Sequence, residues 1–483
     1  MTVDDANAIL LELMDRHPVG SLQLGGIGMW PLVRLALLYA VLKNAGAPMP
    51  AAAEPAAERG CLPEQRAHLG DALLFGEWRR RPDLLLVQSF KDFGSLREGR
   101  PTDPLAEGLA ELSEEFSVQC LSSIGRGSIN SGQAGIAFFQ EIDRAQRLKD
   151  AEVRAFLALL RPIAADIAAR FGRRVVEPLD CLAWGARILA LVPAWSAALR
   201  AIEPRAVMVQ NYIGLEKLAL GAAARRAGIA LIDHQHGMFT RDAAIYLSWP
   251  DLAPGVVDPM PSWFWLWSDW FCERAPADGP SVRRIVGGDL RHAAAQERTP
   301  ERASTRHTVL YLHQPDHSRI GNGEPLPDDF LQLAAAAPPE WLWLVRLHPR
   351  ARRIAEAEIQ CAGLGNVEIA EPTRQPLSHA IALADAALTA DSAAAFETVD
   401  AGLPTVFTGS AIRARLGDPA DPELMIYAGG DAALAALRQA VRKPARPIFL
   451  RRDRNLAVSA LRTILDASPQ QPTSPDTLTR TRR

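Results

Sequence analysis

The chain has little cysteine: five residues in 483, at positions 61, 120, 181, 272 and 361, with no Cys-X-X-Cys pair. This scatter argues against a disulfide framework and against a cysteine-based zinc site. It is typical of a protein of a reducing compartment. We therefore expect a cytoplasmic location.

Charge blocks and long apolar runs are also missing. The formal net charge is −3, and no basic cluster precedes the C-terminal tail, so nucleic acid is not an expected partner. The opening residues 1–7 are polar and acidic, unlike a signal peptide. The apolar stretch Leu22–Leu42 contains Pro31 and Arg34, so it is not expected to span a membrane. We expect a soluble chain, and peripheral contact with the inner face of the cytoplasmic membrane stays open.

Length and periodicity favour two domains. Buried-strand patterns occur in each half of the chain, and residues 291–306 between the halves are polar and contain proline. We predict the following units: a helical segment at 1–80 packed on the next domain, a Rossmann-like domain at 81–290, a linker at 291–306, a second Rossmann-like domain at 307–442, a helix at 443–467 that crosses back, and a disordered tail at 468–483.

The second half contains a strand–turn–helix–strand unit. Ala386–Leu388 predicts a strand, Ala393–Ala401 a helix that ends at Gly402, and a small-residue turn with Ser392 lies between them. Helix starts carry unpaired N–H groups, so the turn is a candidate phosphate pocket. The alternative, an ordinary βαβ unit capped by Ser392, stays open.

The first half contains a buried strand with an unusually polar end. In IALIDHQHG (Ile229–Gly237), strand alternation directs Asp233 and Gln235 to one side and His234 and His236 to the other. Buried polar groups require partners. The sequence does not supply a clear third metal ligand. Catalysis, acceptor binding and structural hydrogen bonding stay open for this strand end.

Three motifs together resemble the GT-B glycosyltransferases, in particular the bacterial capsule and surface-polysaccharide transferases that include CMP-sugar enzymes. They are QHG at 235–237, His-Pro at 348–349, and Asp-Ser followed by Glu397 and Gly402-Leu403-Pro404. The resemblance implies an α/β GT-B fold: two Rossmann-like domains with parallel sheets facing across a cleft, plus an N-terminal helical segment.

The same resemblance implies an enzyme of capsule, O-antigen or lipopolysaccharide biosynthesis. It would transfer a sugar from a nucleotide-sugar donor, a CMP-linked acidic sugar, to a glycan or glycolipid acceptor. No Asp-X-Asp pair is present, so metal-independent catalysis is expected. No cofactor is expected, because the nucleotide-sugar is a substrate.

Site residues follow from these motifs. Asp391 departs from the Ser or Thr frequent at its place, so a phosphate there would require a balancing arginine such as Arg346 or Arg350. The expected donor-binding residues are His348, Pro349, Arg346, Arg350, Ser392, Asp391, Glu397, His313 and Gln314. The catalytic candidates are His236, Asp233 and Asp242, and the acceptor-binding candidates are Gln235, Arg34 and Lys91.

Several alternatives remain at this stage. Arg34 could simply pair on a packed helix, and the loop with Lys91 could be merely polar. Inverting and retaining chemistry are both compatible with these residues. Two other functions are also compatible: a CDP-polyol phosphotransferase of the teichoic-acid type, and a non-catalytic GT-B scaffold that binds glycan or other polysaccharide-assembly enzymes.

Overall fold

The computed structural model describes most of the chain. The described residues are 3–44, 72–75, 81–89, 95–97, 100–102, 104–123, 135–136, 148–172, 175–239, 255, 258–275, 277–279, 281–291, 306–313, 326–347, 354–370, 377–409 and 412–467. The interior of the predicted linker and the whole predicted tail lie outside these residues.

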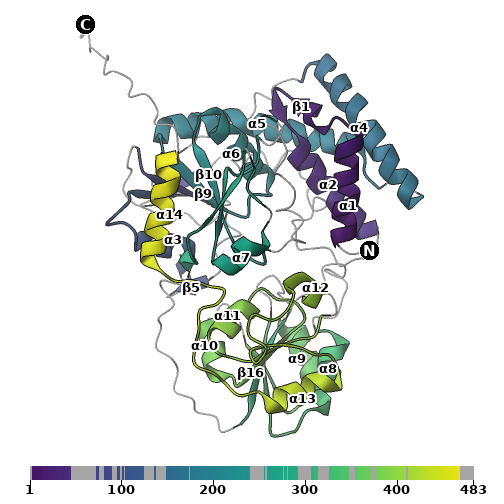
Figure 1. Ribbon diagram of the computed structural model, residues 1–483, viewed down its shortest axis with the longest axis vertical. Coiled ribbons are helices and arrows are strands. Elements are labelled where there is room, and N and C mark those ends of the chain that lie inside the picture. Colours follow the sequence, from purple (N-terminus) through teal and green to yellow (C-terminus); the bar gives the residue numbers. More distant parts are fainter. Residues whose placement is uncertain are drawn as a thin grey trace.

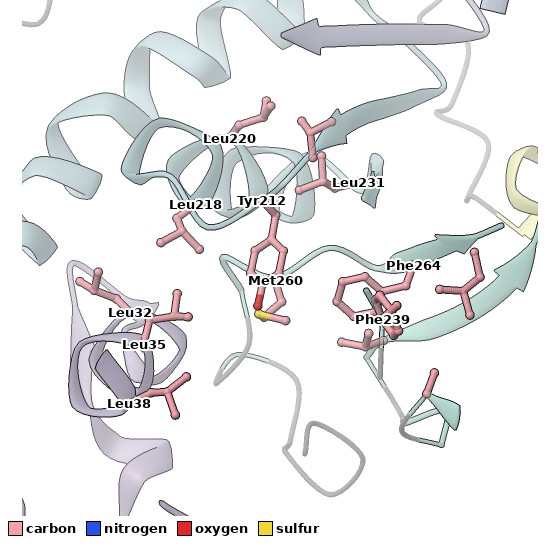
Figure 2. Close-up of a cluster of buried hydrophobic side chains, with 14 of the residues drawn as sticks. Leu32, Leu35, Leu38, Tyr212, Leu218, Leu220, Leu231, Phe239, Met260 and Phe264 are labelled. Carbon is pink, nitrogen blue, oxygen red and sulfur yellow. The ribbon is translucent and has the colours of Figure 1, made fainter. Parts of the chain in front are cut away.

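The N-terminal segment is helical and packs into the first domain. Its elements are α1 (Val3–Arg16), the 3₁₀ helix η1 (Val19–Ser21), the hairpin strands β1 (Gln23–Leu24) and β2 (Ile27–Gly28), and α2 (Trp30–Asn44). The hairpin turn is Gly25-Gly26, with φ of +57° and +69°, a conformation that glycine adopts without strain. Leu32, Leu35 and Leu38 of α2 are buried facing the first domain (Figure 2).

The first domain is built on an eight-stranded sheet in the order β12-β11-β10-β9-β4-β7-β3-β8. The strands from β12 to β7 are mutually parallel, and β3 pairs antiparallel with both β7 and the edge strand β8, so β3 alone runs against the others. The strands are β3 (Ala72–Phe75), β4 (Leu84–Ser89), β7 (Val118–Ser123), β8 (Gly135–Ile136), β9 (Ala206–Gln210), β10 (Ala230–His234), β11 (Trp263–Leu266) and β12 (Arg283–Val286). Strand β3 lies upstream of residue 81, so the sheet draws one strand from the segment predicted as helical.

Alternating side chains bury both faces of this sheet. Leu85 and Val87 of β4 belong to one buried cluster with α2, α5 and α6, whereas Leu84 and Leu86 belong to a second cluster with α3 and α14. The elements around the sheet are the hairpin strands β5 (Ser95–Arg97) and β6 (Arg100–Thr102), and the helices α3 (Pro104–Ala110), α4 (Asp150–Phe171), α5 (Pro178–Ile202), α6 (Leu215–Arg226) and α7 (Asp269–Arg274).

Among the described residues, one helix, α5, has the length and composition that a membrane-spanning helix needs. Half of its most apolar window is buried inside the protein, and it contacts α4 and α6. A core helix of a globular domain has the same properties.

The second domain is a six-stranded, fully parallel sheet in the order β15-β14-β13-β16-β17-β18. Its strands are β13 (Thr308–Leu312), β14 (Leu342–Arg346), β15 (Val367–Ala370), β16 (Ala386–Thr389), β17 (Thr405–Phe407) and β18 (Met425–Tyr427). Its helices are α8 (Asp328–Ala336), α9 (Ile354–Cys361), α10 (Leu377–Leu383), α11 (Ala395–Asp400), α12 (Ile412–Leu416) and α13 (Asp431–Gln439). The strand order is that of a doubly wound nucleotide-binding sheet.

The chain then returns to the first domain. An irregular segment, residues 440–453, leads from α13 to α14 (Arg454–Ala467), which contacts β12 and fills the second cluster of the first sheet (Figure 1). The predicted helix at 443–467 therefore begins later, at Arg454. Two parallel Rossmann-like domains with this return constitute the GT-B architecture, which confirms the predicted fold class.

An aromatic cluster joins the two domains. Phe271 of α7 lies 5.2 Å from Phe396 of α11 between ring centroids, and Trp270 of α7 lies 4.9 Å from Phe449 of the return segment. Phe396 and Phe449 are 4.8 Å apart. Because Phe271, Phe396 and Phe449 are almost fully buried, one dry core runs between the domains, where α7 faces α11 (Figure 1).

Candidate functional site

The candidate donor site lies at the carboxyl end of the second sheet. Strand β13 is followed along the chain by β14 on one side and later by β16 on the other. This is the topological switch point, where the connections diverge and ligands bind in open α/β sheets. His313 follows β13, Arg346 ends β14, and Asp391 and Ser392 follow β16. The sheet thus brings four of the predicted donor residues to one edge.

The turn after β16 is held by hydrogen bonds within the chain. The Thr389 hydroxyl donates to the Leu312 carbonyl at 3.0 Å and accepts from the Ser392 N–H at 3.2 Å. The Ser392 hydroxyl accepts from the Ala394 N–H at 3.3 Å, and the Ser392 carbonyl from the Ala395 N–H at 3.1 Å. Several N–H groups expected to bind phosphate are therefore engaged. What Ser392 retains for a ligand is its hydroxyl proton.

Helix α11 is shorter than predicted. It spans six residues, Ala395–Asp400, rather than Ala393–Ala401, because the turn bonds of Ser392 occupy what would be its first turn. So short a helix has a small dipole, since the dipole sums over aligned peptide units. Ligand binding at this edge must rest mainly on side chains.

Arg346 and Glu397 form a charged pair at this edge. Burial lowers the pKa of Arg346, and the nearby Glu397 carboxylate raises it. Leu344 and Arg346 are two residues apart on β14, so their side chains point to the same face of the sheet, which is the face that carries α11. Arg346 and Glu397 therefore interact on that face. Arg346 stays positively charged at neutral pH. Glu397, which balances this charge, follows it by 51 positions in the sequence.

The opposite face of the same edge combines aromatic rings with carboxylates. Tyr311 is buried, and its ring stacks on Phe330 of α8 at 3.9 Å between centroids. Burial raises the pKa of Tyr311, and the carboxylates of Asp329 and Asp391 raise it further. The negative charge of Asp391 therefore acts on the Tyr311 side of this edge.

His313 lies beside Tyr311 and is almost fully buried. Its ring centroid is 6.4 Å from that of Tyr311, and its backbone N–H donates to the Arg346 carbonyl at 3.0 Å. Its Nδ1 has no hydrogen-bond partner among the residues that the structure describes. A buried polar atom without a partner costs about 1–3 kcal/mol. Burial lowers the pKa of His313 to about 4, so the ring is neutral at pH 7.

The first domain contributes the QHG turn. The Gln235 side chain donates to the Gly237 carbonyl at 2.8 Å and accepts from the Trp267 backbone N–H at 3.0 Å. Gln235 thus uses both ends of its amide to fix the turn at the end of β10 against the end of β11. An acceptor contact of Gln235 stays a prediction.

The QHG turn meets the Ser392 turn. A Cβ atom placed on Gly237 would lie 4.0 Å from the Cβ of Ala393, so the first domain touches the second at the residue that follows Ser392. His236 is half-buried next to Gly237. Two motifs more than 150 residues apart in the sequence are therefore neighbours in space.

The other polar residues of β10 are deeply buried. Asp233 is 1% exposed and pairs in register with Val209 and Phe264. His234 lies on the opposite face, near Trp265, and its Nε2 accepts from the Leu290 N–H at 3.5 Å. Burial lowers the pKa of His234 to about 3, so it is neutral. The predicted alternation of Asp233 and His234 is confirmed.

Arg34 is also buried, 3% exposed, on α2. Burial lowers its pKa to about 10, against the effect of the Tyr212 hydroxyl group, and the guanidinium remains charged at neutral pH. Tyr212 follows β9 at the carboxyl end of the first sheet, next to Asn211, whose φ of +62° is rare outside glycine. Arg34 thus interacts with Tyr212, which lies at the carboxyl edge of the first sheet and is labelled in Figure 2.

Two groups near the site were not anticipated from the sequence. Lys217 of α6 is buried and donates to the Gln210 carbonyl at the end of β9. Asp289, which follows β12, is held by Arg291 through two contacts of 2.9 and 3.1 Å, and the Arg291 guanidinium lies 4.2 Å from the Trp267 ring centroid. In the sequence, the Gly287-Gly288 turn after a strand pattern was the feature that could have indicated Asp289.

The remaining predicted residues lie outside the described part of the chain. They are Lys91, Asp242, Gln314, His348, Pro349 and Arg350. Within the described part, no group of three or more His, Cys, Asp or Glu side chains is arranged to hold a metal ion.

The fold and this edge define a two-domain α/β protein of the GT-B architecture. No protein-family model and no curated protein matches the chain. Among solved structures it is similar to the UDP-GlcNAc 2-epimerase from Neisseria meningitidis bound to UDP-GlcNAc (12% identity, TM-score 0.44, covering 79% of this chain and 99% of that chain).

It is also similar to MurG of Acinetobacter baumannii (13% identity, TM-score 0.37, 81% and 100%) and to the glycotransferase of kitacinnamycin (16% identity, TM-score 0.39, 81% and 96%). These likenesses are weak. The fold therefore rests on the two sheets described above, and any function rests on the site.

Proposed function

We propose that this chain is a glycosyltransferase of bacterial surface-polysaccharide biosynthesis. It transfers a sugar from a nucleotide-sugar donor, a CMP-linked acidic sugar, to a glycan or glycolipid acceptor. The observation that carries the proposal is the contact of two motifs from different domains, Gly237 of the QHG turn against Ala393 of the Ser392 turn. A transferase requires such a junction, because donor and acceptor must meet between groups that each domain supplies.

The donor belongs to the second domain in this proposal. The Glu397 carboxylate suits ribose hydroxyls as a hydrogen-bond acceptor, and Arg346 beside it supplies positive charge toward the departing phosphate. The Ser392 hydroxyl contributes one further donor. His348, which would follow β14 closely, is proposed as an additional phosphate partner.

The base belongs to the first domain. His236 is the favoured candidate, because it is only half-buried and adjoins Gly237, which touches the donor side. Asp233 is 1% exposed and three residues farther back along β10, so it is less accessible to an acceptor hydroxyl. We propose that the reaction proceeds without a metal, in the cytoplasm, where the protein contacts the inner face of the membrane peripherally.

Nucleotide binding tests the proposal and separates it from the alternatives. The melting temperature of the purified chain is measured with CMP, CDP, UDP, GDP and CDP-glycerol. A ligand at 100 times its dissociation constant stabilises the native state by about 2.7 kcal/mol. We expect CMP to raise the melting temperature most. A preference for CDP-glycerol would support a polyol phosphotransferase instead, and no shift with any nucleotide would support a non-catalytic scaffold.

A further inference from the structure

His313 occupies a defined place at the proposed donor site. It is the first residue after β13, the strand from which the connections of the second sheet diverge. Its backbone N–H donates to the Arg346 carbonyl at 3.0 Å, so the ladder between β13 and β14 continues through His313. The position of its side chain is therefore set by the sheet rather than by a loop.

The His313 side chain carries an unused hydrogen-bonding atom. The residue is 5% exposed, and its Nδ1 has no partner within the described part of the chain. Buried polar atoms are normally paired, and an exception at a ligand-binding edge is explained when a ligand supplies the partner. His313 lies at such an edge.

The electrostatic surroundings select which part of a nucleotide fits there. Tyr311 and His313 are two residues apart, so their side chains point to the same face of the sheet, which is the face that carries α8. The carboxylates of Asp329 and Asp391 both raise the pKa of Tyr311 there. A phosphate at this face would meet two negative charges. The positive charge of Arg346 lies on the other face, beside Glu397. Because burial lowers the pKa of His313 to about 4, the imidazole itself supplies no charge at pH 7.

We infer that His313 hydrogen-bonds the uncharged nucleoside part of the donor nucleotide through Nδ1, the ring nitrogen that has no partner among the described residues. The nucleoside then lies on the Tyr311 side of the edge, and the phosphate lies toward Arg346. This inference rests on the proposed function, since it requires a nucleotide at this edge.

The test compares a nucleotide with its own nucleoside. Dissociation constants are measured by calorimetry at pH 7.5 for the best-bound of CMP, UDP and GDP, and for the matching cytidine, uridine or guanosine by competition. The proteins are the parent, His313→Ala and His313→Asn, which keeps a polar group near the Nδ1 position. The matched control is His307→Ala, because His307 lies at the amino end of the same strand, against Trp341.

Loss of one hydrogen bond predicts that His313→Ala weakens nucleotide binding about 3- to 10-fold. The decisive expectation is that the nucleoside loses the same factor. His313→Asn should recover part of the loss, and His307→Ala should bind both ligands like the parent. If His313→Ala does not fold, His313→Asn takes its place: an equal, partial loss of affinity for the nucleotide and the nucleoside supports the inference, and a loss for the nucleotide alone, or no loss, overturns it.

The contrary outcomes are distinguishable. A loss confined to the nucleotide would place His313 against the phosphate and overturn the inference. Unchanged binding in His313→Ala would show that the buried nitrogen serves no ligand, while leaving the proposed function intact. If the parent binds none of the three nucleotides, the proposed function and the inference both fail.

Discussion

At the scale of single residues, the account depends on pairs that join distant parts of the chain. Glu397 was predicted as a donor-binding residue, but its pairing with Arg346 follows only from the structure, because β14 and α11 must be folded before the two charges meet. A carboxylate suits this role, because hydrogen bonds that a sugar donates to a charged acceptor are stronger than those to a neutral one.

Glu397→Gln should weaken binding of the preferred nucleotide about tenfold, because a charge-assisted hydrogen bond becomes a neutral one. A double-mutant cycle with Arg346→Lys measures whether the pair acts as a unit, and we expect a coupling of about 1 kcal/mol. Glu368→Gln, an exposed change on β15, is the control. Equal affinities of Glu397→Gln and the parent would remove Glu397 from the site.

Gln235 shows how a predicted site residue acquires a structural role. The sequence correctly placed Gln235 at the end of a buried strand. Its hydrogen bonds to Gly237 and Trp267 could not be inferred, because they form only when β11 pairs with β10 in the folded sheet.

Gln235→Leu should lower the free energy of unfolding by about 1–3 kcal/mol, since the buried Trp267 N–H loses its acceptor. Chemical denaturation measures this directly. If the role of Gln235 is structural, the free energy of unfolding falls by this amount even without ligand. A variant as stable as the parent but impaired in acceptor use would indicate the acceptor-binding role instead.

At the scale of elements, α11 carries two carboxylates with different partners. Glu397 interacts with Arg346 at the proposed donor site, and Asp400, one turn later, holds the return segment, where its carboxylate accepts the backbone N–H groups of Ile448, Phe449 and Leu450 at 2.6–3.1 Å. A short helix is sufficient here because tertiary contacts, not helix propensity, stabilise it. This is why sequence periodicity predicted the helix correctly but overestimated its length.

The Asp400 anchor predicts a pH dependence. Burial raises the pKa of Asp400 to about 6, against the effect of the three backbone N–H groups. The native state then binds a proton more tightly than the unfolded state, whose pKa is about 3.8. Proton linkage makes the contribution of Asp400 to stability fall as the pH rises from about 4 to 6, by roughly 3 kcal/mol.

Comparison with Asp400→Asn isolates this contribution, because other carboxylates titrate equally in both proteins. The free energy of unfolding of the parent minus that of the variant should decrease between pH 4 and pH 6.5. A difference that rises with pH would mean that the backbone N–H groups outweigh burial and that the native carboxylate has a lowered pKa.

At the scale of the whole molecule, one buried core joins the two domains through α7, α11 and the return segment. The two sheets, their parallel strands and the change from one domain to the next were predictable, because each strand carries a local apolar pattern. The aromatic cluster was not, since Phe449 reaches Trp270 and Phe396 only after the chain has crossed back. Trp263 and Trp265 of β11 lie in one buried cluster, whereas Trp267, which follows the end of β11 at Leu266, lies in the other.

Phe449→Ala should cost about 3–5 kcal/mol, the usual range for emptying a buried aromatic site. Because Phe449 links the domains, we expect calorimetry to resolve two transitions where the parent has one. The control is Phe330→Ala, a change inside the core of the second domain alone. It should lower the melting temperature, but the two domains should still unfold in a single transition. A single transition in Phe449→Ala would show that the aromatic cluster is not what couples them.

The central claim is that a nucleotide-sugar reacts where the QHG turn meets the Ser392 turn. Its most direct measurement is nucleotide release and sugar transfer by the purified chain, with CMP-, UDP- and GDP-linked sugars as donors, surface-glycan fragments as acceptors and mass spectrometry of the products. We predict transfer from a CMP-linked acidic sugar and a loss of roughly a hundredfold in His236→Ala, whose base is removed. Parent protein that binds these donors but transfers none of their sugars, or a His236→Ala variant as active as the parent, would contradict the account.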